Sequence, residues 1–319
     1  MRLRDGKAGE NTLDRSVFKR ISGAGCRGSR ITMSADPVTV EASQIGELAV
    51  YAAVNALSAE MILPESFRVV ILLPPGSEEE RLREIMDQIC RVCAAESLVI
   101  EGGHTEVTSA VNRPVIIGSC TGTAMKGPDK PDRKEKTEKE ETGADQIVMT
   151  KWAGMEASCI LAEDKEELRE VFPETILMRM RKLRRFLSVR TEAQICAAEG
   201  AQCLVDLSEG GVHAALWRLS ARTRRGMRVD TGRIPLLQET IEFANHYDID
   251  PYKIRSAGSL LAVTKDPEAL IEALESSGIP AVRIGTLTRD NDKILINGDE
   301  IRYLDLPQPD ELHKIMRQR

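Results

Sequence analysis

Four short segments combine carboxylates, glycines and small polar residues in patterns that could bind a phosphate group or a metal ion. They are Ser34-Ala-Asp-Pro37, Glu101-Gly-Gly-His-Thr-Glu106, Asp206-Leu-Ser-Glu-Gly-Gly211 and Ser256-Ala-Gly-Ser259. Each follows or precedes a predicted strand or helix, where backbone groups without internal partners can bind a ligand. The last segment has the weakest signal of the four.

Asp36 is the first candidate ligand. A carboxylate at the end of a strand suits Mg²⁺, which prefers one or two carboxylates together with phosphate oxygens. An aspartate followed by a proline also commonly starts a turn. By itself this segment fits a metal site and a simple turn equally well.

The second segment contains paired glycines followed by two polar side chains. Gly102 and Gly103 would let backbone N–H groups approach a phosphate without obstruction by a Cβ atom. His104 and Glu106 flank Thr105, so in an extended chain they face the same side. They could form a pair that faces a metal or phosphate, or they could be exposed polar residues of a tight turn.

In the third segment, Gly210 and Gly211 lead into a helix predicted over residues 212–222. A helix N-terminus preceded by glycines is a suitable anion site, because the free N–H groups and the helix dipole both favour negative charge. The alternative is a strand-to-helix turn that needs glycine for close packing.

The elements that must position these segments indicate an α+β fold. The first half predicts helices over 43–59, with Ser43 as N-cap, and 77–96, with strands over 30–34, 67–73, 98–100 and 115–123. The second half mixes hairpin-like strands with single helices, including one over 176–187, which favours mixed sheets covered by helices over a doubly wound parallel sheet. Residues 126–141 carry six cations and six anions and predict a solvated loop. We therefore expect two domains, 1–142 and 143–319.

The composition restricts the class of protein. The net charge is −6 and the sequence pI is about 5.5, which argues against a nucleic-acid binder. The absence of a long apolar run or signal core predicts a cytoplasmic protein with no membrane segment. The basic clusters at 179–190 and 218–228 are typical of solvated surface.

The seven cysteines have irregular spacing, which indicates reduced thiols. Cys90 and Cys93 form a lone C-x-x-C. Cys93 falls on the apolar stripe of a predicted helix, so a buried thiol is favoured over a metal or redox site. No Walker A, Rossmann or nucleophile-elbow motif occurs.

Taken in order, the chain resembles the aminoimidazole ribonucleotide (AIR) synthetase superfamily, and within it an uncharacterised branch related to the hydrogenase-maturation carbamoyl dehydratase. The matching segments are Ser34-Ala-Asp-Pro-Val-Thr39, Ile45-Gly-Glu-Leu-Ala-Val-Tyr-Ala-Ala-Val-Asn55, Ile71-Leu-Leu-Pro-Pro-Gly76, Gly102-Gly-His-Thr-Glu-Val-Thr108, Val111-Asn-Arg-Pro-Val115, Lys151-Trp-Ala-Gly-Met-Glu156, Asp206-Leu-Ser-Glu-Gly-Gly211, Trp217-Arg-Leu219 and Ile249-Asp-Pro-Tyr-Lys253.

The resemblance implies an N-terminal ATP-binding domain that pairs in a homodimer and a C-terminal α/β sandwich domain. It also implies ATP with Mg²⁺ and activation of an amide- or carbamoyl-type oxygen of a small-molecule substrate by phosphorylation. The residues that it implies for ATP or phosphate binding are Asp36, Asn55, Gly102, Gly103, His104, Thr105, Glu106, Asp206, Glu209, Gly210 and Gly211, with Asp36 also a metal ligand.

Three departures from the family bear on activity. The family has acids in its first glycine loop, whereas Gly23-Ala-Gly-Cys-Arg-Gly-Ser29 has none, and Ala56 stands where the family has aspartate. The dehydratase carries a C-terminal cysteine, but this chain has no cysteine after Cys203. Two hypotheses follow: an ATP-dependent enzyme with an unidentified acceptor, or a catalytically degenerate dimeric protein that binds an anion or nucleotide.

Overall fold

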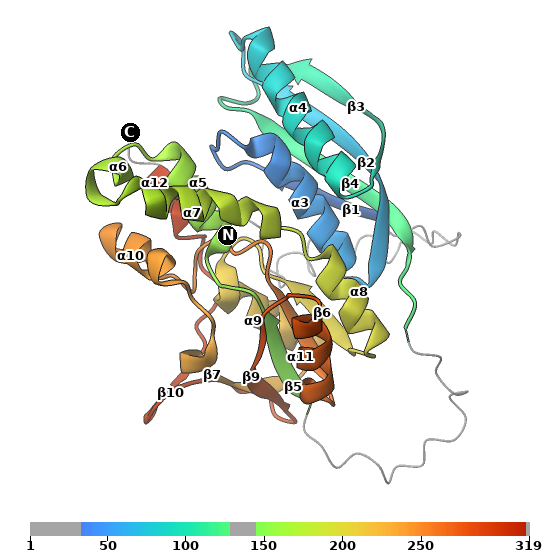
Figure 1. Cartoon of the computed structure of the whole chain (residues 1–319), viewed down its shortest axis with the longest axis vertical. Helices are drawn as coiled ribbons and strands as arrows, with labels where there is room; N and C mark the ends of the chain where they lie inside the picture. Colours follow the sequence, from blue (N-terminus) through green and yellow to red (C-terminus); the bar gives the residue numbers. More distant parts are fainter. Residues whose placement is uncertain (1–32, 128–144, 317–319) are drawn as a thin grey trace.

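A computed structural model describes residues 33–127 and 145–316, which form two β-sheets with their helices (Figure 1). The first sheet contains β1 (Met33–Val38), β2 (Ile62–Leu73), β3 (Val99–Val107) and β4 (Val115–Ala124), in the order β1-β4-β2-β3. Only the β2–β3 pair is parallel. Two helices, α3 (Ile45–Ser58) and α4 (Glu79–Ala95), cover one face of this sheet.

The second sheet has seven strands in the order β11-β10-β7-β9-β5-β8-β6. Its strands are β5 (Gln146–Thr150), β6 (Cys203–Asp206), β7 (Gly226–Asp230), β8 (Leu260–Thr264), β9 (Ala281–Thr288), β10 (Lys293–Asn297) and β11 (Glu300–Tyr303). Its helices are α5 (Met155–Asp164), α6 (Leu168–Val171), α7 (Glu174–Lys182), η2 (Leu183–Phe186), α8 (Arg190–Ala198), α9 (Gly211–Thr223), η3 (Thr231–Arg233), α10 (Gln238–His246), α11 (Pro267–Ser276) and α12 (Leu312–Met316).

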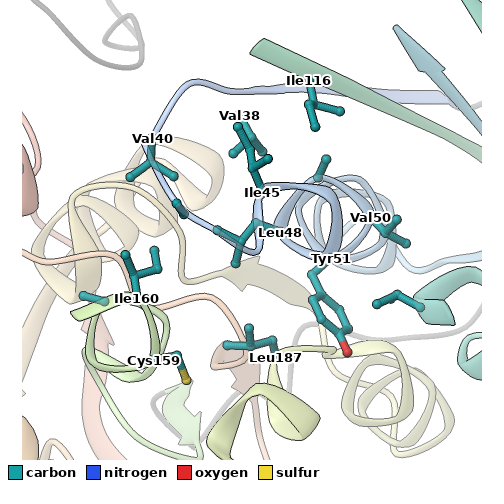
Figure 2. Packing of buried hydrophobic residues seen from close by; sticks show 14 of the residues in the cluster. Val38, Val40, Ile45, Leu48, Val50, Tyr51, Ile116, Cys159, Ile160 and Leu187 are labelled. Atoms are coloured by element: carbon teal, nitrogen blue, oxygen red, sulfur yellow. The ribbon is translucent and has the colours of Figure 1, made fainter. Parts of the chain in front are cut away.

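Helix α3 lies between the first sheet and the helices of the second half. One hydrophobic cluster contains Val38 and Ile116 from the sheet, Leu48 from α3, and Ile160 and Leu187 from the second half (Figure 2). Burial of α3 on several sides explains why its apolar residues do not form a single stripe.

Two buried polar residues, Asn55 and Lys151, stabilise the contact between the two halves of the chain. Asn55 on α3 donates from Nδ2 to the Leu187 carbonyl at 2.7 Å and accepts the Val189 N–H at 2.9 Å. The buried ammonium of Lys151 pairs with Glu192 and donates to the carbonyl of Phe186 at 2.7 Å. These contacts hold the 186–189 segment against the end of α3.

The predicted α+β class, with mixed sheets covered by helices, is confirmed. Several local predictions were wrong. The strand expected over 30–34 continues to Val38, and its residues 30–32 lie outside the described residues. Ser43 does not cap α3, and the helix expected over 176–187 begins at Glu174 and tightens to a 3₁₀ turn after Lys182. The strand expected to end at Ile100 continues to Val107 because it pairs with β2 over that whole length.

The first glycine loop at 23–29 and most of the charged segment at 126–141 lie outside the described residues. In the two described ranges, no helix combines the length and the apolar character needed to cross a membrane.

Candidate functional site

A cavity of about 190 Å³ lies between the two halves of the chain. Its lining combines two of the predicted site residues, Asp36 and Asp206, with basic side chains. The full lining is Met33, Ser34, Asp36, Ala56, Leu57, Glu60, Asp206, Arg218 and Arg222. This is the place where the fold brings carboxylates from both halves together.

The strand pairing determines where Asp36 points. Asp36 lies opposite Gly118 in the β1–β4 ladder, on the side of the sheet that carries the buried Val38. The neighbouring Ser34 is on the same side and donates its hydroxyl to the Ala53 carbonyl of α3 at 2.8 Å. Asp36 therefore faces the helices and the second half of the chain.

Asp206 reaches the cavity from the other half, as the last residue of β6. Two arginines of α9 lie beside it. Arg218 donates to the Asp206 carbonyl at 2.7 Å and to Ser208 Oγ at 3.2 Å. Arg222 donates to the Leu204 carbonyl at 3.0 Å and pairs with Glu60 at 2.5 Å.

Arg218 and Arg222 were not among the site residues predicted from the sequence. Their spacing of four places them on one face of a helix, and that face turns toward Asp206. A signal existed in this spacing, but only the position of α9 beside β6, with both arginines lining the cavity, shows that the face is not plain solvated surface.

The donor set limits how a metal could bind. No group of three or more metal-ligating side chains occurs in the described ranges. Glu60 is paired with Arg222, and Ala56 contributes only a methyl group. Asp36 and Asp206 are the other two carboxylates of the cavity, one from each half of the chain. Two carboxylates suit a Mg²⁺ ion that takes its other ligands from phosphate oxygens and water.

The segment from Gly102 to Glu106 does not form a loop and does not reach this cavity. It lies within β3, the strand at the far edge of the sheet from β1, and it is exposed throughout. His104 and Glu106 are opposite Val70 and Leu72, on the face that the helices leave open. With three strand spacings of about 4.8 Å between the edges, His104 and Asp36 of one chain are about 14 Å apart and on opposite faces.

The paired glycines Gly102 and Gly103 have a structural role in the pairing of β2 with β3. The β2–β3 register shifts between Phe67 and Arg68, and Gly102 has a φ of +139° there. A Cβ atom on Gly103 would lie 2.1 Å from the Val69 carbonyl oxygen. Close approach of the two backbones therefore accounts for Gly103, and the positive φ at the register shift accounts for Gly102. Thr105 is opposite the buried Ile71, on the helix side of the strand.

The N-terminus of α9 is occupied by a carboxylate of the chain itself. Gly210 has a φ of +79° and donates its N–H to Asp310 Oδ2 at 2.7 Å. Glu209 lies 3.7 Å from Arg255 and 3.5 Å from His313. A Cβ atom on Gly211 would lie 2.6 Å from the Tyr252 carbonyl oxygen. The turn and packing interpretation therefore fits Gly210 and Gly211 better than a free phosphate site.

The remaining candidates have structural contacts. Both the Nδ2 and the Oδ1 atom of Asn55 are bound to backbone groups, and the side chain is buried, which fits a structural role better than contact with a nucleotide. Ser256 accepts the Gly154 N–H at 2.8 Å and donates to Ile254. Burial raises the pKa of the Cys93 thiol to about 12, as expected for a buried thiol and not for a redox site.

These features define a two-part α+β protein with a cavity of acids and arginines between its halves. The model of "AIR synthase related protein, N-terminal domain" matches residues 23–124, and the corresponding C-terminal domain model matches residues 145–297. The chain therefore belongs to the AIR synthase related proteins, as the resemblance predicted.

Three individual proteins illustrate the relationship. The carbamoyl dehydratase HypE of Rhizobium leguminosarum is 23% identical over 275 residues, covering 83% of this chain and 75% of that protein. A structure of hydrogenase maturation protein HypE in complex with ATP is 18% identical, with a TM-score of 0.70 over 97% of this chain and 98% of that one. A ThiL structure with AMPPCP and TMP is 15% identical, with a TM-score of 0.69 over 94% and 96%.

Proposed function

We propose that this protein is an ATP-dependent enzyme that phosphorylates the oxygen of an amide- or carbamoyl-type acceptor in the cavity between Asp36 and Asp206. The observation that carries the proposal is the meeting of these two carboxylates with Arg218 in one inter-domain cavity. The solved relatives with bound ATP or AMPPCP support a nucleotide as the ligand. An acceptor oxygen is a poor leaving group until it carries phosphate, which gives the phosphorylation its chemical purpose.

Asp36 and Asp206 would hold Mg²⁺ through one carboxylate each. When bound, the metal would neutralise charge on the phosphate oxygens. Arg218 is already oriented by its bonds to the Asp206 carbonyl and Ser208, so its guanidinium can stabilise charge on a transferring phosphoryl group without first being ordered.

A homodimer is part of the proposal. The face of the first sheet opposite α3 and α4 exposes apolar side chains, among them Met33 at 61% and, on β2, the half-buried Val70 and Leu72. An uncovered apolar sheet face is a typical interaction surface. Since His104 and Asp36 are far apart within one chain, they can share a site only if His104 comes from a second copy.

One observation favours the second hypothesis, a binding protein without catalysis. Ala56 lines the cavity where the family has a carboxylate, while Arg218 and Arg222 add positive charge. Arginines can bind a phosphate group without a metal. In this case the chain would bind a nucleotide or another anion and release no phosphate.

Calorimetric titration with ATP, with and without Mg²⁺, tests both hypotheses, together with an assay for phosphate release. We expect Mg²⁺-dependent binding that Asp36→Asn and Asp206→Asn each weaken by about tenfold or more. Asp87→Asn, an exposed aspartate of α4, is the matched control and should bind like the wild type.

The outcomes separate the alternatives. Slow phosphate release that is lost in Asp36→Asn supports the enzyme. Binding that is independent of Mg²⁺ and produces no phosphate supports the binding protein. The absence of binding at millimolar ATP would rule out the enzyme and a nucleotide-binding protein alike.

A further inference from the structure

A second cavity of about 260 Å³ lies near the other end of α3, where α3, α4 and the segment from α7 to η2 meet. It shares no residue with the cavity that contains Asp36. Its lining is unusually basic for a chain of net charge −6: Glu47, Tyr51, Arg91, Val92, Ala95, Arg181, Lys182, Arg184 and Arg185. We call it the basic groove.

Much of the positive charge in the basic groove has no ion-pair partner among the described residues. Arg91 pairs with Glu47 at 2.6 Å, and Arg181 pairs with Glu174 at 2.6 Å. By contrast, Lys182, Arg184 and Arg185 form no ion pair with any carboxylate in residues 33–127 and 145–316. Arg184 is only partly exposed, so its charge is partly removed from water without compensation.

Tyr51 provides an independent observation. Its side chain projects from α3 with the hydroxyl oxygen at the end farthest from the helix (Figure 2). The residue is only 9% exposed and lines the basic groove, yet its hydroxyl has no hydrogen-bond partner within the described ranges. Because the rest of the side chain is buried and the residue lines the basic groove, the free hydroxyl opens onto the groove and is available for a ligand.

The electrostatic surroundings keep this hydroxyl a donor. Burial, followed by the charge of Glu47, raises the pKa of Tyr51 to about 12. The phenol therefore remains protonated at neutral pH and can donate to an anionic oxygen. Arg184 lies close enough to affect this pKa in the opposite direction, which places the guanidinium and the hydroxyl around the same space.

We propose that the basic groove binds a small ligand through a phosphate group, which accepts hydrogen bonds from Arg184 and the Tyr51 hydroxyl. A phosphate has several acceptor oxygens and a double negative charge, so it can satisfy several cations at once. The carbon part of the ligand would lie against Val92 and Ala95. The groove is too small to hold more than part of a nucleic acid or a protein segment, and the acidic chain as a whole disfavours nucleic acid.

Calorimetric titration of the full chain with inorganic pyrophosphate tests this inference, which does not depend on the proposed enzyme activity. We expect Arg184→Gln and Tyr51→Phe each to weaken binding about tenfold. Arg83→Gln, an exposed arginine of α4 that pairs with Glu79 at 2.7 Å outside the groove, is the matched control. Arg218→Gln controls for binding in the first cavity.

Binding that is weakened by the two groove substitutions and unchanged by both controls supports the proposal. The proposal is overturned if no binding occurs at millimolar pyrophosphate, if Arg184→Gln behaves like Arg83→Gln, or if Arg218→Gln alone abolishes binding. A nucleic-acid oligomer that binds more tightly and loses affinity with the same substitutions would also overturn it, because the ligand would then be a macromolecule. If Arg184→Gln does not fold, the exposed Lys182→Gln and Arg185→Gln variants give the same comparison.

Discussion

Asp310 Oδ2 accepts the backbone N–H of Gly210 at 2.7 Å, so a carboxylate from the C-terminal segment occupies the start of α9. Its other oxygen accepts the Leu312 N–H at 2.9 Å and begins α12. One buried side chain therefore joins the third glycine segment to the last helix. The buried Arg255 lies nearby and pairs with Glu156 at 2.9 Å.

Asp310 should give stability a distinct pH dependence. Burial raises its pKa to about 6, although Arg255 acts in the opposite direction. Because the folded state binds this proton more tightly than the unfolded chain does, the contribution of Asp310 to stability increases as the pH falls through about 6 toward 4. Thermal unfolding from pH 7 to 4.5 should show the wild type gaining stability relative to Asp310→Asn. Asp87→Asn, at an exposed position, is the control and should follow the wild-type pH profile. Equal pH profiles for the wild type and Asp310→Asn would contradict this expectation.

Breaking the buried Lys151–Glu192 pair should destabilise the fold strongly. Both side chains are only 4% exposed, and Glu192→Gln would leave the Lys151 ammonium with carbonyl partners alone. Removing one partner of a buried pair costs about 3–5 kcal/mol. Thermal unfolding would measure the loss, and Glu199→Gln, an exposed position just after the same helix, should have little effect. A melting temperature equal to that of the control would show that the pair contributes little.

Asn55→Ala should reduce stability without changing nucleotide affinity. The substitution leaves the Leu187 carbonyl and the Val189 N–H without partners at the contact between the halves. Two unsatisfied buried groups cost roughly 2–4 kcal/mol. Thermal unfolding and ATP calorimetry well below the melting temperature separate the effects. A loss of ATP affinity in a fully folded Asn55→Ala variant would contradict this prediction and would indicate that Asn55 contributes to nucleotide binding.

Gly103→Ala should disturb the β2–β3 pairing, since the new Cβ would meet the Val69 carbonyl oxygen at 2.1 Å. Amide hydrogen exchange in β2 should accelerate, because the parallel ladder must open locally. Gly127→Ala is a suitable control, as its Cβ would make only an ordinary contact of 3.5 Å with the Ala197 carbonyl oxygen. Unchanged protection of β2 in Gly103→Ala would show that the two backbones can separate at little cost.

The sequence by itself determined the elements and the family. The apolar patterns predict helices over 43–59 and 77–96 and a strand over 115–123, close to the bounds of α3, α4 and β4, because these signals are local. The concordant segments from Asp36 to Lys253 identified the superfamily, since many weak motifs in the right order are jointly specific. The same residues could not show which motifs share a site.

That question was decided by tertiary structure. Strand order placed His104 and Asp36 at opposite edges and on opposite faces of one sheet, and no local pattern specifies that order. Packing of α9 beside β6 made Arg218 part of the cavity, although its sequence context is typical of solvated surface. The sequence at the start of α9 is typical of an anion site. In the structure, the group bound there is the carboxylate of Asp310, which lies 100 residues from Gly210 along the chain. Long-range contacts of this kind depend on how complete elements pack, and local periodicity carries no information about them.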